Sequence, residues 1–222
     1  MSVLSLNGIS FSYGKTPVLD NLSMEFEKGK MYCIVGKSGA GKTTLLSILS
    51  GLAEPDSGTI LYNGKDIKDI DKYEFRSKYI GVIFQSYNLI TKFTAVENVI
   101  LSMDIAGVNG IDKRERAMEL LTSVGLDEDE CARRILKLSG GQQQRVAIAR
   151  ALSYDPDIIL ADEPTGNLDG ETQSEIMDIF RQLAENGKCV IIVSHSTEVA
   201  NLCDEKFELV KIQKQKTKSK IK

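Results

Sequence analysis

The fold class is predicted most directly by the segment Gly36-Lys-Ser-Gly-Ala-Gly-Lys-Thr43. It matches the pattern G-x-x-x-x-G-K-[ST] and lies between a stretch with the pattern of a strand and one with the pattern of a helix. Before it, Met31–Val35 is a continuous apolar run, which is typical of a β-strand covered on both faces. After it, Thr43–Ser50 has the pattern of a short helix that ends before Gly51. A glycine-rich turn from a buried strand into a helix predicts an α/β fold.

This loop has the chemistry of a phosphate-binding site. Its glycines let the backbone curl so that N–H groups point inward around an anion, and the following helix adds the positive end of its dipole. Lys42 can reach the β- and γ-phosphates of a nucleotide, and Thr43 can offer a hydroxyl to Mg²⁺. The alternative is a chance glycine-rich turn between a strand and a helix. The candidate nucleotide-binding residues of the loop are Gly36, Lys37, Ser38, Gly39, Ala40, Gly41, Lys42, Thr43 and Thr44.

The composition is that of a globular chain and excludes disorder over the whole length. Of its 222 residues, 42% are hydrophobic and 27% are charged. The net charge of −3 does not indicate the basic surface that nucleic-acid binding requires. The longest apolar runs, such as Cys189–Val193, are far shorter than the roughly twenty residues that span a bilayer. The first residues, Met1–Asn7, do not resemble a secretory signal. We therefore expect a cytosolic protein without a nucleic-acid partner.

The four cysteines are Cys33, Cys131, Cys189 and Cys203, and they do not have the spacing of a zinc site. In a cytosolic protein we expect all four to be reduced and structural. The last twelve residues, 211–222, contain six lysines and no acidic residue. Such a run is either a solvated chain end or a segment that rests on anionic lipid headgroups.

The hydrophobic pattern changes along the chain. Over the first sixty residues apolar side chains alternate, as at Leu22, Met24 and Phe26, which predicts strands of a sheet. Residues 88–137 have mainly helical spacing, and Asp112-Lys-Arg-Glu115 predicts a capping box at the start of one helix. From Gln142 onward, helices alternate with the strands Ile158–Ala161 and Val190–Val193, and this order predicts a parallel sheet.

Two carboxylates, Asp162 and Glu163, follow the apolar strand that begins at Ile158. The carboxyl end of a parallel strand faces the crevice where ligands bind in α/β sheets. Asp162 there can hold Mg²⁺ through its water shell, and Glu163 can polarise an attacking water. Ordinary turn chemistry is the alternative for Asp-Glu-Pro after a strand.

A second candidate anion site lies at Ser139-Gly-Gly-Gln142, just before an apolar helix. A nucleotide held by Gly36–Thr43 has its phosphates exposed on one side only. We therefore interpret the second site as facing the γ-phosphate of another molecule, which predicts a dimer with ATP between its subunits. A simple N-cap is the alternative.

The three motifs in this order resemble the ATP-binding subunit of ABC transporters, from about Val3 to about Leu209. Leu138–Gln142 reads LSGGQ, the family's signature, and Ile158–Asp162 resembles its Walker B strand. The resemblance implies an α/β P-loop NTPase with a mainly parallel central sheet, an N-terminal antiparallel β subdomain and an inserted α-helical subdomain. It divides the single domain 1–222 into a catalytic core at 1–87 and 138–210, a helical subdomain at 88–137 and the lysine-rich tail at 211–222.

Four further positions take roles from the resemblance. Tyr13 matches the aromatic residue that stacks on adenine, and Gln85 matches the glutamine that contacts Mg²⁺ and senses the membrane partner. Asp169 matches the loop that crosses the dimer interface, and His195 matches the histidine at the γ-phosphate. The expected catalytic residues are Lys42, Gln85, Glu163 and His195; the expected metal-binding residues are Thr43, Gln85 and Asp162; and Tyr13, Ser139, Gly140, Gly141, Gln142 and Asp169 join the loop in binding nucleotide.

The resemblance implies an ATPase that works as a homodimer with two Mg²⁺-ATP molecules and drives a separate integral-membrane permease through its cytoplasmic coupling helix. It places the protein in the cytoplasm, on the inner face of the plasma membrane. The chain departs from the family's pattern at Ser196, where relatives usually have Asp, and after Phe207, where a glycine-containing turn is missing.

Three segments resemble the lipoprotein-release, macrolide-export and antimicrobial-peptide-resistance branch of the family: Phe84–Ile90, Thr94–Val99 and Asp162–Asp169. We therefore predict export or release of peptides, lipoproteins or antimicrobial compounds. An ATPase of the cell-division type, which drives a membrane partner without transport, is the alternative. A P-loop kinase is disfavoured, because nothing in the chain resembles a lid for a phosphate acceptor.

Overall fold

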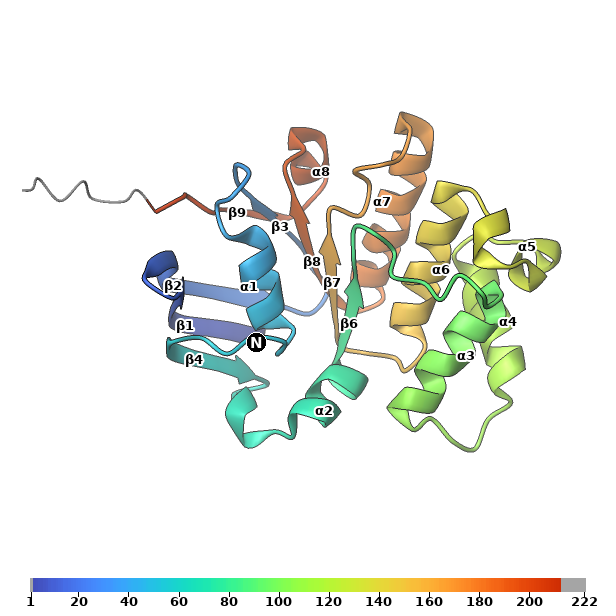
Figure 1. Ribbon diagram of the computed structural model, residues 1–222, viewed down its shortest axis with the longest axis horizontal. Coiled ribbons are helices and arrows are strands. Elements are labelled where there is room, and N and C mark those ends of the chain that lie inside the picture. Colours follow the sequence, from blue (N-terminus) through green and yellow to red (C-terminus); the bar gives the residue numbers. More distant parts are fainter. Residues whose placement is uncertain (1, 213–222) are drawn as a thin grey trace, which may run out of the picture.

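The computed structural model describes residues 2–212, which form two sheets and a layer of helices (Figure 1). One sheet is antiparallel, with the strand order β2-β1-β4-β5. Its strands are β1 (Ser2–Tyr13), β2 (Thr16–Glu27), β4 (Ser57–Tyr62) and β5 (Lys65–Asp66). The predicted N-terminal antiparallel sheet is confirmed. Apart from Lys211 and Ile212, the lysine-rich run lies outside the described residues.

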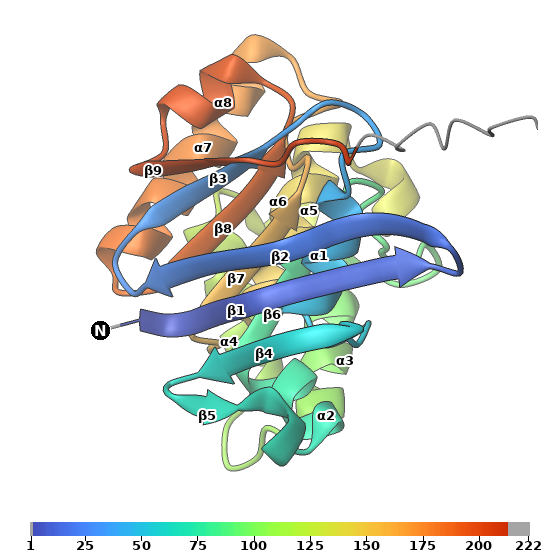
Figure 2. The same ribbon diagram turned by 90° about the vertical axis from the view of Figure 1, so that its left-hand side faces the viewer.

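The second sheet has five strands in the order β6-β7-β8-β3-β9, and every neighbouring pair is parallel. It crosses behind the antiparallel sheet in the view of Figure 2. The predicted parallel sheet is therefore confirmed. Its strands are β3 (Met31–Val35), β6 (Ile80–Ile83), β7 (Ile158–Asp162), β8 (Cys189–Ser194) and β9 (Glu205–Glu208).

Helices cover both sides of the parallel sheet, and α1 follows the glycine-rich loop directly. As expected, α1 ends before Gly51: Leu49 is its last residue, Ser50 is its C-cap, and Gly51 adopts the left-handed conformation with φ 68°. None of the described helices is long and apolar enough to cross a membrane. The α-helices are α1 (Lys42–Leu49), α2 (Lys72–Glu74), α3 (Ala95–Ala106), α4 (Lys113–Ser123), α5 (Glu128–Ala132), α6 (Gly140–Leu152), α7 (Gly170–Glu185) and α8 (Thr197–Asn201); a π-helical turn at Phe75–Tyr79 follows α2.

The structure corrects one predicted helix cap. The Asp112 side chain accepts hydrogen bonds from the amides of Arg114 and Glu115 at 2.9 and 3.0 Å. Asp112 therefore forms an N-cap but not a full capping box. In the described part of the chain, the Asp112 amide does not donate to the Glu115 side chain. Complete capping boxes start α3, α5 and α6 instead.

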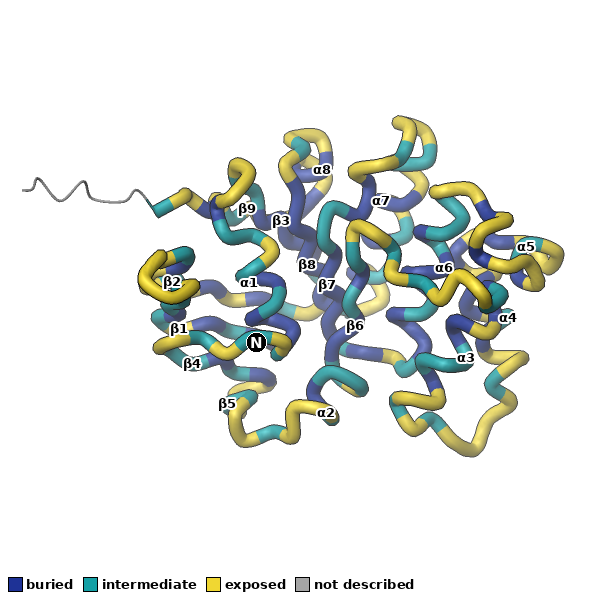
Figure 3. The backbone as a smooth tube through the Cα atoms, in the orientation of Figure 1, coloured by how far each residue is buried: buried dark blue, intermediate teal, exposed yellow. Residues whose placement is uncertain are grey.

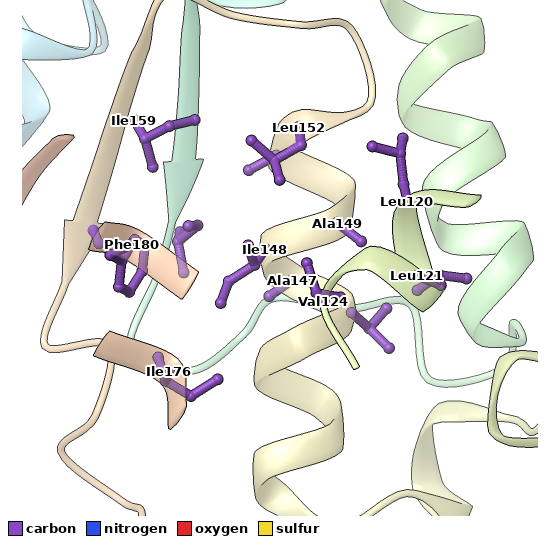
Figure 4. Packing of buried hydrophobic residues seen from close by; sticks show 14 of the residues in the cluster. Leu120, Leu121, Val124, Ala147, Ile148, Ala149, Leu152, Ile159, Ile176 and Phe180 are labelled. Atoms are coloured by element: carbon purple, nitrogen blue, oxygen red, sulfur yellow. The ribbon is translucent and has the colours of Figure 1, made fainter. Parts of the chain in front are cut away.

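The apolar strands are buried because each contributes to two hydrophobic clusters, one on each face of the sheet. In β7, Ile158 and Leu160 face the antiparallel sheet and α1, whereas Ile159 and Ala161 face the helices. Figure 3 shows these strands as the deeply buried centre of the molecule. In Figure 4 the cluster extends from Ile159 through α6 to the α4 region. Because the sheet is buried on both faces, it holds ligand-binding residues at its strand ends in fixed positions.

Candidate functional site

An open hollow of about 550 Å³ lies at the carboxyl ends of the parallel strands. The four expected catalytic residues and the three expected metal-binding residues all line it. They come from four places in the sequence: the loop before α1, the end of β6, the end of β7 and the end of β8. The lining residues are Ser38, Gly39, Gly41, Lys42, Thr43, Thr44, Gln85, Asp162, Glu163 and His195.

The glycine-rich loop fits tightly against its surroundings. Gly39 and Gly41 have φ values of 75° and 98°, which side-chain-bearing residues rarely adopt. A Cβ on Gly41 would lie 2.8 Å from Cγ1 of Val18 in β2. The Lys42 Nζ donates a hydrogen bond of 2.8 Å to the Gly36 carbonyl, so the lysine lies across its own loop. Glycine is therefore needed here both for backbone conformation and for space.

The residue pair Thr43 and Asp162 has the chemistry of a magnesium site. Thr43 Oγ1 donates to Asp162 Oδ2 at 3.4 Å. Burial raises the pKa of Asp162 above its ordinary value, against the lowering effect of the Thr43 hydrogen bond. A cation would relieve the cost of burying this carboxylate. In the described residues, no group of three or more His, Cys, Asp or Glu side chains is placed to hold a metal ion by itself, which fits an ion that takes its other ligands from phosphate and water.

Glu163 is held firmly beside His195. Its backbone is left-handed, with φ 45°, and its amide donates to the Val193 carbonyl at 2.9 Å. The carboxylate accepts from the Ser194 hydroxyl at 3.1 Å and from the His195 amide at 3.3 Å. Its Oε1 lies 2.8 Å from His195 Nδ1. The Glu163 side chain is 12% exposed and that of His195 is 70% exposed, so the imidazole reaches into the open hollow.

The sequence also predicted site residues that the structure places outside this hollow. Tyr13 is 62% exposed at the end of β1 and packs edge-on against Phe11, with ring centroids 5.0 Å apart. Asp169 caps α7 and accepts a hydrogen bond of 2.9 Å from the Thr172 amide. Of the glycine-rich loop, Gly36, Lys37 and Ala40 do not line the hollow either.

The signature segment is also outside the hollow, at the start of α6. Ser139 Oγ accepts from the Gln142 amide at 3.2 Å, and the Ser139 amide donates to Gln142 Oε1 at 2.7 Å. The first turn of α6 is therefore closed by its own side chains, so the N-cap alternative describes this segment in the single chain. Gly140 and Gly141 follow in the first turn.

A second hollow of about 710 Å³ adjoins the first at Gly39 and was not predicted from the sequence. It lies between the start of β2 and the segment that follows β9. Only the pairing of β9 with β3, continued by the bond from the Leu209 amide to the Val35 carbonyl, brings this distant segment to the loop. Its lining residues are Thr16, Pro17, Val18, Lys37, Gly39, Glu208, Leu209, Val210, Lys211 and Ile212.

A P-loop at the end of a buried parallel strand, next to Asp162 and a Glu163–His195 pair, defines a P-loop nucleotide hydrolase. The family model described as ABC transporter matches residues 19–166, and the chain belongs to this family. It is therefore an ABC transporter ATP-binding subunit, an ATPase that acts on ATP with Mg²⁺. The predicted fold class, family and enzyme class are confirmed.

Curated relatives match over nearly the whole chain. The lipoprotein-releasing system ATP-binding protein LolD of Bacteroides thetaiotaomicron is 42% identical over 94% of this chain and 97% of its own length. The uncharacterised ABC transporter ATP-binding protein YclH of Bacillus subtilis is 43% identical, and the match covers 94% of each chain. The macrolide export ATP-binding/permease protein MacB of Vibrio parahaemolyticus is 43% identical over 86% of this chain, which corresponds to 30% of MacB. The predicted branch is confirmed.

Solved structures of MJ0796, described as a bacterial ABC transporter cassette, share the fold. Its dimeric structure superposes with a TM-score of 0.85 at 37% identity, over 93% of this chain and 94% of that chain. A dimeric post-hydrolysis state bound to ADP and Pi gives a TM-score of 0.85 at 35% identity, over 95% of this chain and 97% of that chain.

Proposed function

We propose that two copies of this chain clamp two ATP molecules and thereby drive a separate membrane permease that exports or releases peptides, lipoproteins or antimicrobial compounds. One observation carries the clamp: the hollow contains one half of an ATP site, while Ser139–Gln142, the second anion site, lies outside it in the same chain. A second copy can supply the missing half. The dimers of MJ0796 and the names of LolD and MacB support the proposal.

In this proposal the hollow of about 550 Å³ binds the triphosphate and cleaves its terminal bond. Lys42 and the loop amides offset the charge that develops on the γ-phosphate. Thr43, Gln85 and Asp162 would hold Mg²⁺, which would supply further positive charge beside the phosphates. Glu163 accepts the proton of the attacking water. His195, oriented by the bond at Nδ1, presents its other ring nitrogen to the γ-phosphate.

The adenosine end of ATP would lie toward the second hollow, which shares Gly39 with the first. Tyr13, which is 62% exposed at the nearby strand end, is available to stack on the base. Its edge contact with Phe11 leaves a ring face open. Asp169 belongs to the dimer contact in this proposal.

The permease would bind a hollow of about 210 Å³ between the π-helical turn and α3. Tyr73 and Ile105 line it side by side and are 59% and 53% exposed, so they offer a small apolar surface for a partner. Arg76 adds a positive charge at the rim. An amphipathic coupling helix of the permease fits this chemistry. Binding there would hold the ATPase on the inner face of the plasma membrane.

The clamp is tested with the variant Glu163→Gln, which keeps the shape of the side chain and removes the base. We expect light scattering to show a shift from monomer to dimer when Mg²⁺-ATP is added. The double variant Ser139→Arg/Glu163→Gln should stay monomeric, because the arginine blocks the second anion site. A matched control is Glu198→Gln, which removes an exposed carboxylate three residues after His195.

No shift in Glu163→Gln, either alone or co-expressed with the permease, would contradict the clamp. A dimer that persists in the double variant would contradict the role of Ser139. Loss of binding of a fluorescent ATP analogue in both variants would instead place the fault in the nucleotide site.

A further inference from the structure

The loop that follows Gln85 contains a turn with an uncommon backbone conformation. Tyr87 and Asn88 are consecutive non-glycine residues in the left-handed region, with φ values of 59° and 51°. Such a pair is rare, because each Cβ crowds the neighbouring carbonyl oxygen. Within the loop, the Tyr87 amide donates to the Phe84 carbonyl at 2.9 Å, and the Asn88 amide donates to the Ser86 carbonyl at 2.6 Å. Contacts from other elements must hold the turn in place.

Arg150, near the end of α6, supplies one such contact. Its guanidinium donates to the Tyr87 carbonyl at 2.9 Å and also to the Asn88 carbonyl. Within residues 2–212 it has no carboxylate partner, and burial lowers its pKa. A half-buried guanidinium would be better compensated by a carboxylate. Instead, the guanidinium binds and orients the two backbone carbonyls of Tyr87 and Asn88.

The Tyr87 side chain makes a second connection to the same helix. Its hydroxyl lies 3.3 Å from the position of a Cβ added to Gly140, in the first turn of α6. Its ring packs against the hydrophobic cluster that contains α6. Figure 1 shows the segment between β6 and α3 crossing α6. The turn therefore contacts α6 at two places.

The far end of the loop is fixed as well. Asn98 of α3 is 2% exposed and forms a pair of hydrogen bonds with the backbone of Ile90, at 2.8 and 3.2 Å. Between this fixed segment and β6 lie Gln85 and Ser86, both of them exposed. A displacement of the turn would therefore be passed along the chain to Gln85, which lies two residues before Tyr87.

We propose that Arg150 is a positioning residue, which fixes the turn after Gln85 to α6, so that Gln85 in the hollow and the Ser139 end of α6 move together. The proposal rests on the proposed function, because that function gives Ser139 its role toward the ATP of the second copy. In consequence, a displacement of the helices at the hollow lined by Tyr73 and Ile105 would move both Gln85 and Ser139.

A double-mutant cycle on ATP hydrolysis by the full chain tests the proposal. We expect Arg150→Met to lower kcat about 10- to 100-fold with little change in KM, as misplacement of an active-site group does. In the Gln85→Ala background, Arg150→Met should change kcat less than about twofold, because the group that it positions is already gone. Arg150→Lys should restore part of kcat, since it keeps the charge and one donor direction.

Arg145→Met is the matched control, because Arg145 lies on the same helix but bonds the Val124 carbonyl and Glu175 instead. Hydrogen exchange of peptides covering 84–92 should rise in Arg150→Met and stay unchanged in Arg145→Met. Equal losses of kcat from Arg150→Met in both backgrounds would overturn the proposal, as would unchanged exchange in 84–92. If the wild-type chain hydrolyses ATP but Glu163→Gln fails to dimerise, the proposed clamp fails, whereas the cycle still decides the role of Arg150.

Discussion

Replacing Gly41 by alanine should damage the glycine-rich loop more than its single added methyl suggests. The φ of Gly41 is 98°, and for a residue with a Cβ such a conformation costs about 1–2 kcal/mol. The new Cβ would also lie 2.8 Å from Val18 Cγ1 and 3.3 Å from the Val18 carbonyl oxygen. Val18 is β-branched and cannot turn away freely, so overpacking adds about 1–3 kcal/mol. The expected loss in free energy of unfolding is about 2–5 kcal/mol.

Gly64→Ala is the control that separates the two contributions. Gly64 has a φ of 80°, and nothing lies within 4 Å of a Cβ added there. It should lose only the backbone contribution of about 1–2 kcal/mol. Urea unfolding of both variants measures the difference, which we expect to be about 1–3 kcal/mol at an unchanged m-value.

Binding of a fluorescent ATP analogue completes this experiment. The loop can relieve the contact with Val18 only by moving away from β2, which should weaken nucleotide binding in Gly41→Ala and leave it intact in Gly64→Ala. Equal stability of the two variants would refute the packing argument. Unchanged nucleotide affinity in Gly41→Ala would refute the view that the phosphate-binding site needs this backbone conformation.

Three further predictions concern single side chains. Ser139→Ala removes the cap of α6 and should lower the free energy of unfolding by about 0.5–2 kcal/mol, measured by urea unfolding. Because the folded pKa of Asp162 is raised, its contribution to stability is greatest below pH 3.8 and is lost as pH rises through the folded value. Without nucleotide, Asp162→Asn should therefore gain stability over the wild type at pH 7, and this gain should shrink toward pH 4; a gain that grows in acid would reverse the assignment. Tyr13→Ala should weaken ATP binding by about 1–3 kcal/mol, and Tyr13→Phe should not, as titration with a fluorescent analogue can show.

Capping shows how far local sequence predicts local structure. A polar residue that starts a helix, such as Asp112, could be predicted, because an N-cap satisfies backbone amides within one turn. The Asp112 cap forms as expected, but the return bond from Glu115 does not. The complete box between Thr94 and Glu97 was not predicted, although its pattern is present in the sequence. Whether a side chain returns the bond depends on its competing contacts, which the pattern does not contain.

The chemistry of the hollow could be predicted for the same kind of reason. A parallel sheet brings the carboxyl ends of its strands to one edge, so motifs that follow apolar strands must meet there. Lys42, Asp162 and His195 meet in this way, although the last two lie more than a hundred residues from the loop. The bond between Glu163 and His195 was not predicted, because it depends on the left-handed backbone of Glu163.

The sequence by its local pattern predicted the early strands, the helical spacing of 88–137, the strands at 158–161 and 190–193 and the motifs at their ends, because each depends on periodicity or on backbone chemistry within a few residues. It did not predict the short elements α2, α8 and β9. Only the tertiary structure decided how the turn at Tyr87 is held, since its partner, Arg150, is more than sixty residues away on a different element. The same holds for the second hollow, which exists because β9 pairs with β3. Long-range pairing leaves no local pattern, because its free energy comes from surfaces that meet only in the folded chain.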